Sequence, residues 1–144
     1  MRIFLPVALL FLAACASSSP QTPAEPSPVE GSWQWVETSG GKMGSTRGPD
    51  SEQYELIARF GPEGQFEITK GGVSWVSGSY ALADSERGAV VEYALDAPPP
   101  SSTVFSFSGL GDPPRHMFSI NADSILVLDE GCCDRYQHVF QRAK

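Results

Sequence analysis

The two histidines of this sequence, His116 and His138, are the side chains best suited to acid–base or metal chemistry near neutral pH. His116 stands two residues before Phe118, and His138 two residues before Phe140, in alternating runs that predict inward-facing imidazoles. Such histidines are either hydrogen-bonded core residues or ligands of a metal or a haem. Neither has the His-x-Cys or His-Glu-x-x-His spacing of metal sites. We therefore expect core histidines, no metal and no cofactor.

The segment Asp129–Asp134, which reads Asp-Glu-Gly-Cys-Cys-Asp, holds the densest group of carboxylates and thiols in the chain. Together with His138 it offers the donors of a soft-metal site. However, one turn rarely supplies four converging ligands, and the loop of a last hairpin is usually polar. We therefore interpret the segment as a polar loop, with metal binding as the alternative.

No arrangement of residues in the sequence has the signature of catalysis. Cys132 and Cys133 would need a nearby base and an oxyanion site to act as nucleophiles, and the sequence places neither. The Ser-His-Asp, paired-carboxylate and phosphate-binding glycine-loop motifs are absent. We therefore expect no catalytic residues and predict that the protein is not an enzyme.

Cys15 is a third residue with its own chemistry, and it follows the features of an export signal. Met1–Arg2 is a short basic start, and Ile3–Ala14 is uncharged and almost wholly apolar. A membrane span needs about 20 apolar residues, so this run is too short to span and has the length of a signal-peptide core. It ends in Leu-Ala-Ala-Cys, which resembles the bacterial lipobox read by the lipoprotein signal peptidase.

This resemblance implies that residues 1–14 are removed as a lipoprotein signal peptide and that the Cys15 thiol carries a diacylglycerol. The alternative is an ordinary secretory signal cut near Ala14 or Ala16, with Cys15 incidental. Two or more acyl chains anchor a protein stably, whereas one binds only marginally. Ala16 stands where an Asp would favour the inner membrane. The resemblance therefore implies a protein anchored by lipid in the outer membrane of the bacterial envelope, facing the periplasm, with surface exposure as the alternative.

Residues 15–29 are predicted to join this anchor to the rest of the chain. Residues 16–29 contain four prolines and four serines and lack the apolar residues of a core. Proline favours extended polyproline II at ~3.1 Å per residue, so a flexible tether of this length reaches up to roughly 40 Å from the membrane. A proline-rich ligand for another protein is the alternative.

After acylation of Cys15, Cys132 and Cys133 are the only remaining cysteines, and the envelope is usually oxidising. Adjacent Cα atoms lie ~3.8 Å apart across a trans peptide, below the usual ~4.4–6.8 Å of disulfides. A bond between them would therefore be strained and easily reduced. We expect this vicinal disulfide or mixed redox states. Two free thiols, an intermolecular bridge and a bound metal are the alternatives.

Composition excludes several classes of partner. The 144 residues are the size of one ordinary domain, with 41% hydrophobic and 19% charged residues. Ten basic against seventeen acidic side chains give a net charge of −7, which disfavours nucleic acid and a polybasic hold on anionic lipid. Fourteen glycines and twelve prolines indicate many turns and disfavour a helical bundle.

From Glu30 onward, short runs of β-forming residues alternate with turn signals, which predicts one all-β domain over residues 30–144. Period-two alternation indicates eight or nine strands of about six residues. The large side chains expected to face inward are Trp33, Trp35, Tyr54, Leu56, Phe60, Phe66, Ile68, Tyr80, Leu82, Val91, Tyr93, Leu95, Phe105, Phe107, Phe118, Ile120, Leu126 and Leu128. The clearest turn is Gly61–Gly64. Even spacing favours an antiparallel up-and-down barrel over a sandwich, because closure removes exposed sheet edges.

The two ends of this domain resemble those of lipocalins. In that family a Gly-x-Trp opens the first strand and an Arg near the C-terminus packs over the Trp, and Gly31, Trp33 and Arg142 stand in those positions. The order of short motifs is similar to that of small bacterial lipocalin-like lipoprotein domains, namely Gly31–Val36, Gly40–Gly41, Phe60–Phe66, Ser77–Tyr80, Leu126–Leu128, Cys133–Asp134 and Tyr136–Arg142. The resemblance implies a lipocalin-like barrel of about eight strands whose chain ends meet at Trp33.

Three functions fit these features. A lipocalin-like barrel implies a carrier of a small apolar ligand at the barrel mouth, although about twenty large inward side chains would fill an eight-stranded barrel or leave room for one small ligand. Loops and acidic charge would suit a protein-interaction module, such as an inhibitor of an envelope hydrolase or protease. A structural lipoprotein would need no ligand. We expect the bilayer as a partner through Cys15 and a small apolar ligand, with the other two functions as alternatives.

Overall fold

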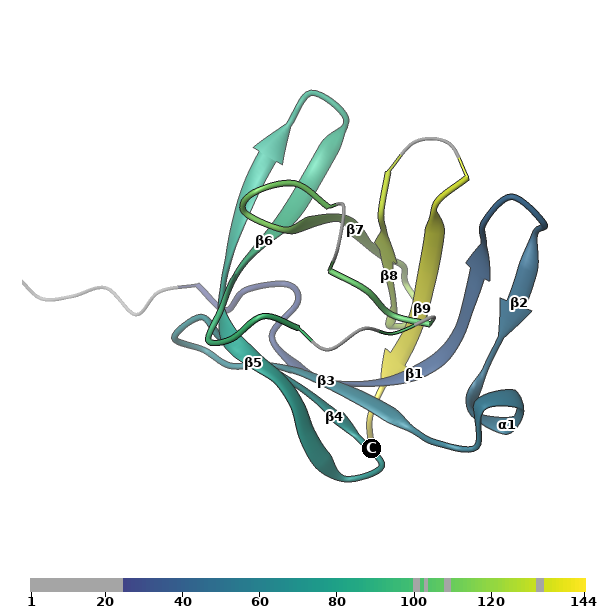
Figure 1. Cartoon of the computed structure of the whole chain (residues 1–144). Coiled ribbons are helices and arrows are strands. Elements are labelled where there is room, and N and C mark those ends of the chain that lie inside the picture. Colours follow the sequence, from purple (N-terminus) through teal and green to yellow (C-terminus); the bar gives the residue numbers. More distant parts are fainter. Residues whose placement is uncertain (1–24, 100–101, 103, 108–109, 132–133) are drawn as a thin grey trace, which may run out of the picture.

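The chain forms a closed antiparallel β-barrel of eight strands with one extra strand (Figure 1). The computed structural model describes residues 25–99, 102, 104–107, 110–131 and 134–144. Its elements are β1 (Gly31–Gly40), β2 (Ser45–Arg47), α1 (Pro49–Glu52), β3 (Leu56–Phe60), β4 (Gln65–Lys70), β5 (Val73–Ser85), β6 (Gly88–Leu95), β7 (Arg115–Ile120), β8 (Ile125–Asp129) and β9 (Tyr136–Arg142). Strands β3 to β9 pair in chain order, and β1 pairs with both β3 and β9 to close the barrel. The all-β barrel prediction is confirmed, and the closed barrel is consistent with a lipocalin-like fold.

Strand β2 and helix α1 lie outside this barrel. One edge of β1 pairs first with β3, from Gly31 to Gln34, and then with the short β2, from Thr38 to Gly40. No sequence pattern indicated β2, because three residues are too few to show alternation. Within the described residues no helix is long and apolar enough to cross a membrane.

Local sequence accounts for the tight turns. The predicted turn at Gly61–Gly64 is present: Phe60 pairs with Phe66, and Gly64 has the positive φ of 78° that glycine tolerates. Between β7 and β8 the side chain of Asn121 accepts hydrogen bonds from the backbone N–H groups of Asp123 and Ile125, at 3.0 and 2.9 Å. Such side-chain turns fix where one strand ends and the next begins.

Strand β5 bends around Gly78, where it changes partner from β4 to β6. Gly78 is paired with Phe66 on one side and Leu95 on the other. A Cβ at Gly78 would run into the carbonyl of Ala94, so the close approach of β6 requires glycine here. Two residues on, the Tyr80 hydroxyl donates to the Gly61 carbonyl at 3.0 Å. In the Ser-Gly-x-Tyr motif, Gly78 therefore permits the close approach of β6, and Tyr80 ties β5 to the turn at Gly61.

The barrel interior is packed with the large side chains that the alternation predicts. The buried core comprises Val29, Trp33, Trp35, Leu56, Ala58, Phe60, Phe66, Ile68, Val76, Val91, Tyr93, Val104, Phe105, Phe107, Leu110, Leu126, Leu128 and Phe140. Val29, just before β1, is fully buried, and its carbonyl accepts the indole N–H of Trp33 at 2.6 Å.

One residue expected inside, Leu82, is 37% exposed. The expectation is wrong because β4 pairs with β5 only as far as Ser79. Beyond that residue β5 pairs only with β6 among the described strands, and Leu82 lies opposite Val91, which pairs in turn with His116 of β7 (Figure 1). A strand without a neighbour on one side leaves its side chains partly open to water.

A second correction concerns Phe105 and Phe107, which we expected on a strand. They are buried in the core, but the described residues between β6 and β7 form no strand. Val90 of β6 pairs directly with Met117 of β7, so the sheet has no place for another strand there. Instead the Ser102 hydroxyl accepts the backbone N–H groups of Val104 and Phe105, both at 3.2 Å. The alternation predicted correctly that both aromatic rings are buried. Its prediction that they lie on a strand was wrong.

The chain ends meet at Trp33, the contact that the lipocalin resemblance implies. The guanidinium carbon of Arg142 lies 4.1 Å from the centroid of the buried Trp33 ring. The same guanidinium donates to the Glu30 carbonyl at 2.6 Å. Gly31 has a φ of 128°, and a Cβ there would collide with the Arg142 guanidinium. Glycine, indole and guanidinium thus form one packed unit.

Candidate functional site

His138 lies on β9, fully buried, and both of its ring nitrogens have partners. Nδ1 is 2.8 Å from the Thr38 hydroxyl on the neighbouring β1, and Nε2 is 3.2 Å from the Glu130 carboxylate. Thr38 and His138 face each other because they are directly paired across β1 and β9. The barrel closure therefore creates this contact.

The Thr38 hydroxyl lies between two polar side chains. The Trp35 indole N–H donates to the Thr38 oxygen at 3.0 Å. The Thr38 hydroxyl also shares a hydrogen bond with Nδ1 of His138, and Nε2 of His138 shares one with Glu130; the tautomer of His138 sets which group donates in each. Indole, hydroxyl, imidazole and carboxylate form one chain of buried polar groups, in which each donor has an acceptor.

His116 lies on β7 and is also fully buried, but among the described residues only one of its nitrogens has a partner. Nδ1 is 3.2 Å from the hydroxyl of Tyr93 on β6, whereas Nε2 is buried and no described residue forms a hydrogen bond with it. Burial, with a smaller contribution from His138, holds the pKa of His116 well below its usual 6.5. Burial likewise raises the pKa of the Tyr93 hydroxyl above 10. His116 is therefore neutral at physiological pH.

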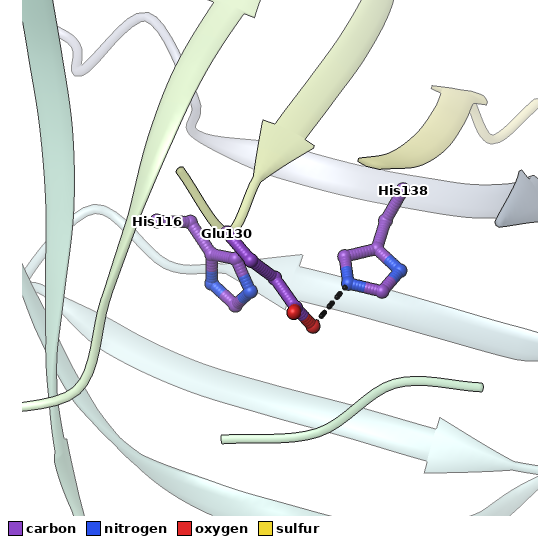
Figure 2. Close-up of side chains that lie close together, drawn as sticks. All are labelled: His116, Glu130 and His138. Atoms are coloured by element: carbon purple, nitrogen blue, oxygen red, sulfur yellow. Dashed lines mark hydrogen bonds and ion pairs between the residues drawn. The ribbon is translucent and has the colours of Figure 1, made fainter. Parts of the chain in front are cut away.

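Three polar side chains converge at the end of the barrel where β8 ends and β9 begins (Figure 2). One ligand atom from each of His116, Glu130 and His138 lies within 4.8 Å of the others. The register explains this, since Met117 pairs with Asp129 and Leu128 pairs with His138. Glu130 directly follows β8, which lies between β7 with His116 and β9 with His138.

Phe105 covers this cluster from inside the barrel. Its ring centroid is 4.4 Å from that of His138 and 5.2 Å from that of His116. Phe107 adds an edge contact to His116, with ring centroids 6.0 Å apart. The segment between β6 and β7 therefore keeps the two imidazoles in apolar surroundings.

A cleft of about 630 Å³ lies at the same end of the molecule. Its floor includes Val90, Met117 and Asp129, which alternate with inward-facing residues and so lie on the outer face of β6, β7 and β8. Its lining residues are Ser85, Glu86, Arg87, Val90, Leu110, Gly111, Arg115, Met117, Asp129, Glu130, Gly131 and Arg135. Glu130, with a side chain 10% exposed, belongs to both the cleft and the buried cluster.

The residues that sequence reasoning selected fall in three places. Both histidines are in the cluster, buried and hydrogen-bonded as the core-histidine interpretation requires. The Trp33–Arg142 stack lies toward the other end of β9. Cys15, Cys132 and Cys133 lie outside the described residues.

Sequence reasoning missed that His116 joins the group of Glu130 and His138. It considered His138 with the segment Asp129–Asp134 but left His116 apart. The signal that connects them is the short turn of the β7–β8 hairpin, which sets His116 near the strand that ends before Glu130.

No family model matches this chain, and no curated protein and no solved structure is significantly similar to it. The closed eight-stranded antiparallel barrel is consistent with a lipocalin-like fold. The functional inferences below therefore rest on the residues and their geometry.

Proposed function

We propose that this protein is a lipid-anchored lipoprotein of the bacterial envelope whose lipocalin-like barrel binds a small amphiphilic molecule. The observation that carries the binding proposal is the 630 Å³ cleft at one end of the barrel. A volume of a few hundred Å³ is typical of sites for small molecules. Anchoring is supported by the Leu-Ala-Ala-Cys sequence that ends at Cys15.

The lining of the cleft favours an amphiphile over a purely apolar ligand. Val90, Leu110 and Met117 offer an apolar surface. Charged residues of both signs surround it, among them Arg87 and Arg115. A ligand with an apolar body and a polar head would satisfy both parts, because polar groups that a purely apolar ligand covers lose their water.

The barrel core favours binding in the cleft, whose floor is the outer face of β6, β7 and β8, over binding in a deep interior cup. Phe66, Tyr93 and Phe107 pack against one another inside the barrel, with ring centroids 4.8 to 6.1 Å apart. Phe105 continues this packing to the histidines. Aromatic rings at these spacings are in direct contact, so the central part of the barrel is occupied by the protein's own side chains.

Anchoring and binding would support each other. A proline-rich tether of the length expected from the sequence would hold the domain within roughly 40 Å of the bilayer, where an amphiphile is most concentrated. The net charge of −7 disfavours non-specific binding of the whole chain to anionic headgroups.

The proposal is tested by native mass spectrometry of the full-length protein extracted in mild detergent. We expect a co-purifying small molecule. Binding of the fluorescent probe anilinonaphthalene sulfonate is then titrated with the wild type, Met117→Lys and Val73→Lys. Met117 lines the cleft, whereas Val73 is 70% exposed at a distant turn and serves as the matched control.

We expect Met117→Lys to weaken probe binding at least tenfold and Val73→Lys to leave it unchanged. Equal binding by both variants would contradict the cleft as the site. Extraction of a stoichiometric protein partner in place of a small molecule would contradict the ligand proposal and favour the interaction module.

A further inference from the structure

We propose that His116, Glu130 and His138 form a binding site for one divalent transition-metal ion, with zinc as the best fit. The inference is independent of the amphiphile proposed for the cleft. It rests on the convergence of three donor groups and on a buried imidazole nitrogen that has no partner.

The distances are close to those of a three-ligand site. Zinc bonds of about 2.1 Å in a tetrahedron place ligand atoms about 3.4 Å apart. His138 Nε2 and Glu130 Oε1 are already 3.2 Å apart. The three donor atoms lie within 4.8 Å of one another, so binding requires His116 to approach by little more than 1 Å.

Both imidazoles have the outer partners that metal-binding histidines use. A ligating histidine almost always donates its other ring N–H to a second group, which fixes its orientation. Here Nδ1 of His116 meets the Tyr93 hydroxyl, and Nδ1 of His138 meets the Thr38 hydroxyl. In each case the Nε2 atom is left for a metal bond.

The unpartnered nitrogen of His116 is the observation that a purely structural cluster does not explain. A buried polar atom without a hydrogen bond costs about 1–3 kcal/mol of stability. The same atom is fully satisfied as a metal ligand. Since the ring is enclosed by Phe105 and Phe107, no protein group among the described residues takes this role.

The proton balance at His138 allows metal binding without a change in the ring's charge. In the metal-free tautomer with its proton on Nε2, Nε2–H donates to Glu130 and Nδ1 accepts from Thr38. When Nε2 bonds a metal, the proton resides on Nδ1 and donates to the Thr38 oxygen, which can accept from both Trp35 and His138.

Two imidazoles and one carboxylate are the donor set that suits zinc and its neighbours among the transition metals, and not calcium or magnesium. Three protein ligands leave the fourth position open. Glu130 lines the cleft, so an ion reaches the site from there and a water or ligand group completes its coordination.

The test uses the full-length protein in detergent, stripped with a chelator, with Cys132 and Cys133 replaced by serine so that thiols do not compete for the metal. Zinc chloride is titrated by calorimetry, and Co²⁺ absorption reports the coordination. The variants are His116→Phe, which keeps a ring in the aromatic packing, and Glu130→Gln, which keeps the shape and a hydrogen-bond acceptor. Glu67→Gln makes the same change at an exposed carboxylate on β4, away from the cluster and the cleft, and serves as the matched control.

We expect one zinc per chain, a rise in the unfolding temperature on adding zinc, and a loss of affinity of at least tenfold in His116→Phe and in Glu130→Gln. Glu67→Gln should bind within about twofold of the parent. Circular dichroism shows whether each variant is folded, and Glu130→Gln carries the test if His116→Phe is not. Absence of stoichiometric binding in the parent, or equal binding in Glu130→Gln, would overturn the proposal. So would zinc binding that requires the cysteines.

Discussion

At the scale of single residues, Trp33 is the side chain that joins the two ends of the barrel domain. It is fully buried, donates to the Val29 carbonyl and lies under the Arg142 guanidinium. The indole therefore contacts the segment before β1 and the end of β9 at once. A cation over an indole contributes about 0.5–2 kcal/mol in addition to the area it buries.

We predict that Trp33→Ala lowers the free energy of unfolding by about 3–5 kcal/mol, the usual cost of truncating a core aromatic residue. Urea unfolding followed by far-ultraviolet circular dichroism measures it without relying on tryptophan fluorescence. Val73→Ala, at a 70% exposed position, should change the value by less than about 0.5 kcal/mol. A loss below about 1 kcal/mol for Trp33→Ala would contradict its place in the core.

His116 predicts a pH dependence of stability in the metal-free protein. Its pKa is well below 6.5 in the folded state and near 6.5 when unfolded. Above pH 6.5 His116 is unprotonated in both the folded and the unfolded state, so it does not change the stability with pH. Below it the unfolded state takes up a proton that the native state does not, and stability falls by up to about 1.4 kcal/mol per pH unit until the native pKa is reached.

The measurement compares wild type and His116→Phe in chelator from pH 7.5 down to about pH 5, a range that includes the ordinary histidine pKa. The other titratable groups facing His116 are Tyr93, Glu130 and His138. These are present in both proteins, so the difference between the curves isolates His116 and its coupling to them. We expect the wild type to lose more stability than the variant as the pH falls. Parallel curves would rule out a buried neutral His116.

At the scale of elements, the segment between β6 and β7 contributes side chains to the core without joining the sheet. Phe105 is fully buried and contacts Phe107, Phe140 and both histidines. The backbone N–H groups of Val104 and Phe105 donate hydrogen bonds to the Ser102 hydroxyl, in place of the hydrogen bonds of a strand. This arrangement makes the segment part of the fold and not a removable cover.

We predict that Phe105→Ala lowers the free energy of unfolding by about 3–5 kcal/mol, while the closer match in volume, Phe105→Leu, costs less than about 1.5 kcal/mol. Chemical unfolding of both variants checks this. A loss below about 1 kcal/mol for Phe105→Ala would mean that the segment leaves the barrel readily. In that case the interior would be open to a ligand.

At the scale of the whole molecule, attachment to the membrane is the prediction that governs where the barrel acts. The mature chain would begin at Cys15, followed by the proline-rich tether and then the packed residues from Val29 onward. Two or three acyl chains on one cysteine give stable anchoring, since each buried CH₂ adds about 0.8 kcal/mol.

We predict that cells given an alkyne fatty acid label the wild-type protein and not Cys15→Ser. Cys132→Ser, which removes a different cysteine, should label like the wild type. In-gel fluorescence after coupling to an azide dye measures this. Equal labelling of wild type and Cys15→Ser would refute lipidation at Cys15.

The sequence by itself determined the properties that depend on local interactions. Period-two alternation predicted the buried face of most strands, as for Trp33 and Trp35 on β1, although it was wrong for Leu82 on β5. Glycine and proline marked the turn at Gly61–Gly64, because only a few residue types accept its backbone angles. For these features the neighbours along the chain supply the physical cause.

Only the tertiary structure decided the strand partners and what their register brings together. Alternation gives a side chain's face but not the partner across the sheet. Phe105 satisfied the pattern without a strand, because every barrel strand on either side already had its partner. His116, Glu130 and His138 meet because β7, β8 and β9 pair in one register, and Thr38 reaches His138 because β1 closes on β9. These contacts depend on hydrogen bonds between strands distant in the chain, which no local pattern encodes.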